Sequence, residues 1–132
     1  MTLDELENQL PNGLHDAKLM SFFVNLEDRS LKLKVEIDHS SPDPEVPSLE
    51  PCPVEIMITG LCYFSLNPPD PGLINGTSWI SAGNEVIEKK MISPEVAAKL
   101  PSGAFLHYIF LGSWNALMLI GGMDARIEFL QI

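Results

Sequence analysis

Apolar and polar residues alternate in two neighbouring stretches near the start of the chain. The apolar positions are Met20, Phe22, Val24 and Leu26 in the first stretch, and Leu31, Leu33, Val35 and Ile37 in the second. A period of two is typical of β-strands that bury one face. A four-residue loop over 27–30 would pair Leu26 with Leu31 and bring both apolar sets to the same face. We therefore predict an antiparallel hairpin in which these side chains are buried.

Two short segments carry the signals of helix starts. Thr2 and Glu5 have the spacing of a capping box, in which each side chain bonds the backbone N–H of the other residue. Leucines follow at helical spacing up to Pro11, which ends the pattern. Further along, Ser93-Pro94-Glu95 combines a capping serine, a proline suited to the first turn and an acidic residue. We predict one helix at the N-terminus and a second helix that runs to about residue 100.

The remaining apolar stretches indicate further strands. They span residues 54–66, 79–87, 104–111, 116–120 and 125–130. Within them, Gly60 marks a bulge or a close approach of backbone, and residues 82–84 are predicted to turn a small hairpin. Residues 112–115 are predicted as the turn of another hairpin. The expected fold is a single α+β domain over residues 1–132, with a mainly antiparallel β-sheet of about six to eight strands and two short helices.

Residues 39–53 differ from the rest of the chain in composition. They include five prolines and no Lys or Arg, together with Asp43, Glu45 and Glu50. Proline cannot donate a hydrogen bond within a sheet, so this density of prolines disfavours a strand. Loops of this length are functional or disordered more often than they are simple connections. We predict an acidic, extended and solvated loop.

The chain is strongly acidic, with eight Lys and Arg against eighteen Asp and Glu and a formal net charge of −10. Nucleic acids and anionic membranes are bound through clustered basic residues, so neither is an expected partner. Residues 100–123 contain no Asp, Glu, Lys or Arg and are long enough to span a bilayer, but their glycines and Pro101 favour two buried strands. The acidic N-terminus lacks the pattern of a secretory signal, which predicts a cytoplasmic protein.

The chain lacks the common motifs of catalytic and cofactor sites. Cys52 and Cys62 form no Cys-x-x-Cys motif, and we expect both to be reduced thiols. No Gly-x-Ser-x-Gly, phosphate-binding loop or dinucleotide fingerprint occurs, and the three histidines have no metal-binding spacing. We therefore expect neither a metal nor another cofactor. The missing motifs remove the common classes of catalytic site but do not exclude an enzyme, since catalytic groups can lie far apart in the sequence.

Two histidines stand out for their surroundings. His15 and Asp16 lie between the first helix and the first strand, where they either hold the loop by hydrogen bonds or form part of a site. Adjacent side chains of an extended chain point to opposite faces, so these two would need a bend to contact each other. His107 alternates with apolar residues in a predicted strand, which is typical of a hydrogen-bonded core histidine.

Trp79 and Trp114 both lie in or beside predicted turns. Tryptophan at such a place either closes the end of a core or, where it is exposed, anchors an interface with another protein. The pattern is consistent with either role, closing the core or anchoring an interface, for both residues.

The run Gly13-Leu14-His15-Asp16-Ala17, followed by the alternating hairpin up to residue 37, resembles a loose set of small bacterial proteins. Their first strand opens with a motif of Gly, Leu or an aromatic residue, His, Asp and Ala. Some of them are similar to immunity proteins of polymorphic toxin systems. The resemblance covers residues 12–37 and implies a cytoplasmic bacterial protein, with no catalytic residues to carry over.

We expect a non-enzymatic, immunity-like protein that binds a basic protein partner, because an acidic surface attracts cationic proteins. The residues expected to take part are Asp43, Glu45, Glu50, Trp79 and Trp114. Two alternatives remain. One is a small enzyme or small-ligand binder with a pocket near His15 and Asp16, and the other is a homo-oligomer that associates through a sheet edge or an apolar face.

Overall fold

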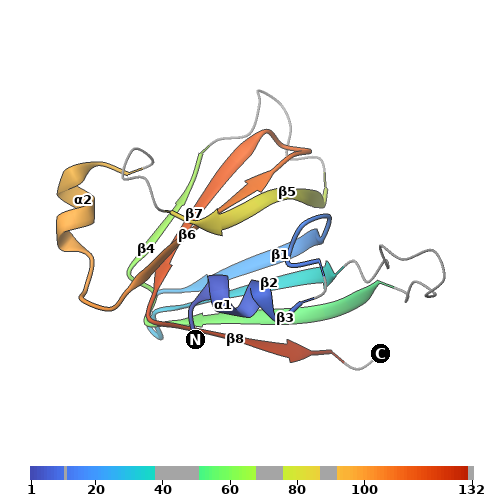
Figure 1. The fold of residues 1–132 in the computed structure, drawn as a ribbon, viewed down its shortest axis with the longest axis horizontal. Coiled ribbons are helices and arrows are strands. Elements are labelled where there is room, and N and C mark those ends of the chain that lie inside the picture. Colours follow the sequence, from blue (N-terminus) through green and yellow to red (C-terminus); the bar gives the residue numbers. More distant parts are fainter. Residues whose placement is uncertain (11, 38–50, 68–75, 87–91, 131–132) are drawn as a thin grey trace.

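The computed structural model describes residues 1–10, 12–37, 51–67, 76–86 and 92–130, and it shows two short helices and eight β-strands (Figure 1). The helices are α1 (Leu3–Asn8) and α2 (Pro94–Lys99). The strands are β1 (Lys18–Asn25), β2 (Ser30–Ile37), β3 (Cys52–Thr59), β4 (Tyr63–Leu66), β5 (Ser78–Glu85), β6 (Phe105–Leu111), β7 (Ala116–Gly122) and β8 (Asp124–Phe129). The prediction of an α+β fold, mainly antiparallel sheet with two short helices, is confirmed.

All eight strands belong to one antiparallel sheet in the order β4-β7-β6-β5-β1-β2-β3-β8. The contact between β5 and β1 is narrow, because only Lys18 with Trp79 and Leu19 with Ser78 are paired. This junction divides the sheet into a first half-sheet, β1-β2-β3-β8, and a second half-sheet, β5-β6-β7-β4. The strands of the two half-sheets run at an angle to each other in Figure 1.

The half-sheets are also joined at a second place, where the chain passes twice from one to the other. Gly60–Cys62 connects β3 to β4, and Met123 connects β7 to β8. The Met123 N–H donates to Thr59 O at 3.0 Å, so a hydrogen bond joins the two places where the chain passes between the half-sheets. Gly60 has φ +61, and a Cβ there would lie 2.7 Å from Met123 Cγ. The predicted close approach at Gly60 is confirmed, although the strand predicted over 54–66 is divided there into two.

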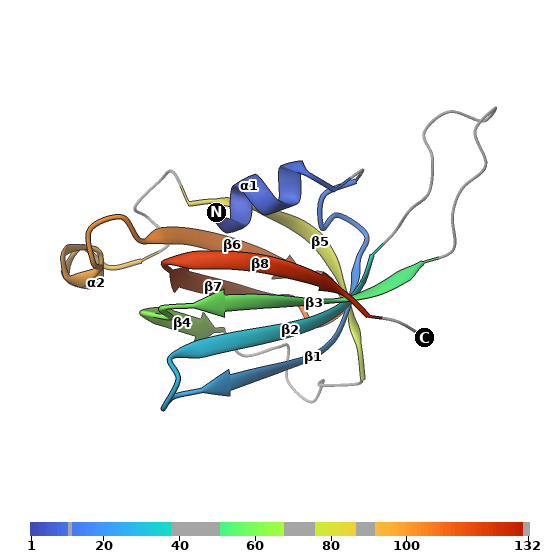
Figure 2. The same cartoon turned by 90° about the horizontal axis from the view of Figure 1, so that it is seen from below.

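The core lies between the half-sheets. Its fully buried large side chains include Leu31, Leu33, Ile37, Ile56, Ile58, Ile80, Ile109, Leu111 and Met118. Leu3 and Leu6 of α1 join the same cluster, and α1 lies against β5, β6 and β8 (Figure 2). The predicted capping box holds this helix in place: the Glu5 N–H donates to Thr2 Oγ1 at 3.0 Å, and the Thr2 N–H donates to Glu5 Oε1 at 3.2 Å.

The first hairpin has a different register from the predicted one. Val24, not Leu26, is opposite Leu31, and the turn covers residues 26–29. Asn25 explains the early turn, since its Oδ1 accepts from the Asp28 N–H and its Nδ2 donates to Asp28 Oδ2, both at 3.0 Å. A bulge follows Leu19. Met20 (41 % exposed) and Leu26 (83 % exposed) therefore lie outside the core, against expectation.

Two other predictions need correction. The small hairpin predicted over 79–87 is wrong, because β5 runs unbroken through residues 82–84 and pairs with β6. Cys52 and Pro53, predicted within the loop 39–53, begin β3. Proline is tolerated at the start of a strand, where few ladder hydrogen bonds are lost.

The other predicted elements are present. Ser93 caps α2, with its Oγ accepting from the Val96 N–H at 3.2 Å. β6 and β7 flank a turn at 112–115. Within the described residues, neither helix is long and apolar enough to cross a membrane.

Candidate functional site

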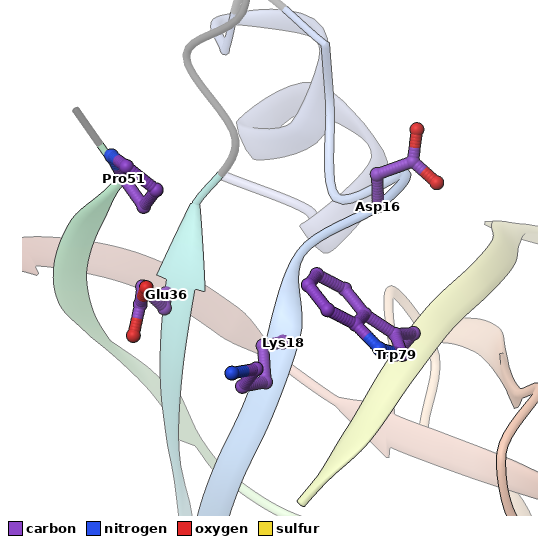
Figure 3. A pocket seen from close by; sticks show the side chains of 5 residues that line it. All are labelled: Asp16, Lys18, Glu36, Pro51 and Trp79. Atoms are coloured by element: carbon purple, nitrogen blue, oxygen red, sulfur yellow. The ribbon is translucent and has the colours of Figure 1, made fainter. Parts of the chain in front are cut away.

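A cleft of about 420 Å³ opens on the outer side of the sheet, next to the junction between β1 and β5. It is lined by Asp16, Lys18, Glu36, Pro51 and Trp79 (Figure 3). These residues come from four separate segments of the chain, so only the folded sheet brings them together. The lining combines two carboxylates and one ammonium group with an indole ring and a proline ring.

Strand pairing places three of these side chains side by side. Lys18 on β1 is opposite Glu36 on β2 and opposite Trp79 on β5. Directly opposite residues of antiparallel strands lie on the same face of the sheet. Trp79 is 52 % exposed, and Lys18 Nζ lies 5.1 Å from the centroid of its ring. The indole therefore presents an aromatic surface to solvent with a cation already close to it.

Asp16 stands at the rim of the cleft in a backbone conformation that few residues adopt. Its φ is +64, and its N–H donates to Ile80 O at 2.9 Å. The bend brings Asp16 Oδ2 to 3.0 Å from His15 Nδ1, although both side chains are more than 60 % exposed. The two neighbours thus form a pair, and the extended backbone assumed from the sequence is wrong here.

The residues around this pair anchor the segment. Leu14 and Ala17 are fully buried in the core, on either side of the exposed His15 and Asp16. The Ala17 N–H donates to Leu14 O at 3.1 Å, which closes the turn. The apolar residues of the run Gly13–Ala17 therefore attach the turn to the core. Its polar residues lie exposed beside the cleft.

The acidic residues Asp43, Glu45 and Glu50 lie outside the described residues. The chain leaves the described part at Ile37 and returns at Pro51. Glu36 and Pro51, which lie at these two ends, both line the cleft.

Trp114 has a different environment from Trp79. It is 8 % exposed, belongs to the core cluster, and its Nε1–H donates to Gly76 O at 3.2 Å. Little of its ring is available to a partner. Of the two tryptophans that the sequence singled out, the cleft contains only Trp79.

Sequence reasoning missed Lys18, Glu36 and Pro51. The alternating pattern places Lys18 and Glu36 on the polar face of the hairpin, but many other side chains share that face. Only the pairing of β1 with β5, between residues about sixty positions apart, shows which of them surround Trp79.

A second histidine–carboxylate pair lies in the core. His107 Nε2 is 3.2 Å from Glu7 Oε1, and the two side chains are 1 % and 11 % exposed. The prediction of a hydrogen-bonded core histidine is confirmed, but its partner on α1 was not foreseen. A Cβ at Gly83 would lie 3.0 Å from Glu7 Oε1, so the glycine leaves room for the carboxylate.

The described residues contain no group of three or more His, Cys, Asp or Glu that could hold a metal ion. Cys52 and Cys62 are free thiols. Partial burial raises the pKa of the Cys62 thiol, and the nearby charge of Arg29 offsets part of this effect.

Comparison of the chain with protein-family models, with curated proteins and with solved structures found no match in any of the three. Its function is therefore argued from the cleft and its charges.

Proposed function

We propose that the protein is a non-enzymatic binding protein that engages a basic protein partner, and that the cleft receives a Lys or Arg side chain of this partner. The observation that carries the proposal is that the half-exposed Trp79 lines the same cleft as Asp16 and Glu36. An indole face attracts cations, and carboxylates form charge-assisted hydrogen bonds with them. Exposed tryptophan is also a frequent anchor of protein interfaces.

The charge of the whole chain supports the same kind of partner. A net charge of −10 attracts basic proteins over long range and raises their rate of association. The acidic residues Asp43, Glu45 and Glu50 belong to a segment whose two ends meet the cleft. Their three charges are part of this negative net charge. Residues 12–37 resemble small bacterial proteins, some of which are similar to immunity proteins, and this resemblance implies a cytoplasmic protein.

Lys18 determines which basic side chain fits better. Its ammonium group lies near the Trp79 ring, so an incoming cation competes with an intramolecular one. A guanidinium group is planar, stacks on aromatic rings and bonds a carboxylate through two N–H groups at once, whereas an ammonium group does not. We therefore expect the cleft to prefer Arg over Lys.

A small-ligand binder is the second candidate function. The volume of about 420 Å³ lies within the range of ligand pockets, and the exposed His15–Asp16 pair stands at the rim. A neutral or anionic small molecule would use Lys18, His15 and the Trp79 ring. This candidate predicts binding that does not depend on a basic group in the ligand.

The test is a titration with a hexaarginine peptide, monitored by the change in intrinsic tryptophan fluorescence of the native protein and of Trp114→Phe, with a hexacitrulline peptide as the neutral control of the same shape. We expect hexaarginine to bind and hexacitrulline not to bind. Binding should weaken between about 20 mM and about 200 mM salt, because salt screens the attraction. Equal affinity for the two peptides would contradict the proposal and favour the second candidate.

A pair of matched variants locates the binding. Glu36→Gln and Glu95→Gln remove the same charge, but Glu95 lies on the first turn of α2, outside the cleft. Loss of a charge-assisted bond should weaken hexaarginine binding about threefold or more in Glu36→Gln. Glu95→Gln should have only the small effect of net charge. If both variants weaken binding equally, the cleft is not the site.

A further inference from the structure

The pair formed by His15 and Asp16 lies where it can change the charge of the cleft. Asp16 is one of the two carboxylates that line the cleft, and His15 Nδ1 lies 3.0 Å from Asp16 Oδ2 (Figure 3). Both side chains are more than 60 % exposed, so the imidazole ring can exchange protons with water. Binding of a basic side chain uses the carboxylate, which leaves the imidazole beside it without a role.

The backbone of the turn holds these two side chains together. Neighbouring side chains of an extended chain point to opposite faces, but the φ of +64 at Asp16 allows them to meet. The Asp16 N–H donates to Ile80 O at 2.9 Å, which fixes the bend on one side. The Ala17 N–H donates to Leu14 O at 3.1 Å, and both of these residues are buried. The contact between imidazole and carboxylate is therefore built into the folded turn.

The proton on the imidazole ring decides how much charge Asp16 offers to a ligand. Histidine side chains gain or lose a proton between about pH 5 and about pH 8, whereas exposed carboxylates stay ionised in this range. A protonated His15 donates a charge-assisted hydrogen bond to Asp16 and offsets its negative charge. It also adds a cation at the rim of the cleft, which repels an incoming Arg or Lys side chain. A neutral His15 leaves the charge of Asp16 to the ligand.

The other charged groups of the cleft do not change their charge in this way. Lys18 and Glu36 also line the cleft, but ammonium and carboxylate groups at a surface keep their charges between about pH 5.5 and about pH 8. His107, the other histidine in the described part of the chain, is buried in the core and does not line the cleft. Among the described residues, His15 forms an ion pair with Asp16 alone.

We propose that His15 is a pH-sensitive regulator of the cleft, and that the protein binds a basic partner more tightly at about pH 8 than at about pH 5.5. This inference rests on the proposed function of the cleft. The direction of the effect follows from charge, since a proton on His15 and a cation in the cleft compete for the same carboxylate of Asp16. Binding is therefore strongest where His15 is neutral, and it weakens as the pH falls.

Calorimetric titration of the whole protein with hexaarginine, at the two pH values and equal ionic strength, tests the regulation. We expect the dissociation constant of the native protein to be about threefold higher at about pH 5.5 than at about pH 8, an effect of the size typical of one exposed ion pair. His15→Gln keeps a polar side chain that takes up no proton. The ratio of its two dissociation constants should therefore fall to about one.

A variant with a fixed charge gives the opposite arrangement. His15→Lys places a permanent cation beside Asp16 and should raise the dissociation constant at about pH 8 about threefold. The matched control is Ser102→Lys, which adds the same charge at an exposed position after α2 and outside the cleft. At about 100 mM salt a charge acts over only about 10 Å, so this control should stay within about 1.5-fold of the native value.

Equal binding of hexaarginine by the native protein at the two pH values would overturn the regulation and leave the proposed function of the cleft in place. A pH dependence that persists in His15→Gln would assign the effect to another group and would also overturn the regulation. So would equal weakening by His15→Lys and Ser102→Lys, because the effect would then come from net charge. Absence of binding at both pH values would contradict the proposed function itself, together with the inference that rests on it.

Discussion

Among the described residues, two histidine–carboxylate pairs have similar distances between nitrogen and oxygen but opposite surroundings. His107 and Glu7 are 3.2 Å apart, 100 positions apart in the sequence, and buried between β6 and α1. His15 and Asp16 are 3.0 Å apart, adjacent in the sequence, and exposed at the rim of the cleft. The distance between the two atoms therefore does not show how much a pair contributes to the stability of the fold.

Burial is what separates the two pairs. In the core, each polar group has lost its contacts with water, so removing one partner leaves the other without compensation. At the surface, water replaces the lost partner at little cost. We infer that the Glu7–His107 pair attaches α1 to the sheet, whereas the His15–Asp16 pair contributes little to stability and is free to contact a ligand.

The largest expected effect comes from Glu7→Leu, which leaves His107 buried without its partner. Its free energy of unfolding should fall by about 2–4 kcal/mol. The double variant Glu7→Leu/His107→Leu should recover at least part of this loss, because no unpaired polar group remains. Urea denaturation measures both. A change in Glu7→Leu no larger than that of a surface pair, below about 1 kcal/mol, would remove the distinction between the two pairs.

An intermediate effect is expected at Asp16, where the backbone matters more than the side chain. At φ +64, glycine is not strained, whereas alanine is strained by its Cβ. Asp16→Gly should therefore be more stable than Asp16→Ala by about 1 kcal/mol, although both variants lose the contact with His15. Thermal unfolding of the two variants side by side measures the difference. Equal stability of the two variants would show that the positive φ at residue 16 does not destabilise a residue that has a Cβ.

The smallest effect is expected for His15→Ala. Both partners of this pair are exposed, so its free energy of unfolding should fall by less than about 0.5 kcal/mol. The same urea denaturation used for Glu7→Leu provides the comparison. A loss above about 1.5 kcal/mol would mean that the exposed pair is structural after all, and the turn would have to be regarded as part of the core.

Local signals in the sequence were sufficient for much of the fold. The capping residues Thr2 and Ser93 predicted both helix starts, and the alternating pattern identified β1 and β2. The register of the hairpin was not predictable in the same way, because a shift of two residues keeps every side chain on the same face. The hydrogen bonds between Asn25 and Asp28 decide between the two registers, and alternation contains no information about them.

The candidate site depends on contacts that are distant in the sequence. His15, Asp16 and Trp79 attracted attention because of their residue types and positions near turns. Lys18 and Glu36 become significant only when β5 is placed beside β1, and Glu7 only when α1 is placed over β6. Such pairings are set by how the whole sheet packs, which a pattern along one strand does not reveal.

The two tryptophans allow a direct measurement of whether the cleft beside Trp79 binds a basic side chain. An ¹⁵N–¹H spectrum of the native protein contains one indole N–H signal from Trp79 and one from Trp114. On titration with hexaarginine at low salt, we expect the Trp79 signal to move and the signal of the buried Trp114, bonded to Gly76 O, to stay in place. A saturable shift of the Trp79 signal alone is the predicted result. If neither signal moves while other acidic parts of the surface respond, the cleft is not the binding site and the account is wrong.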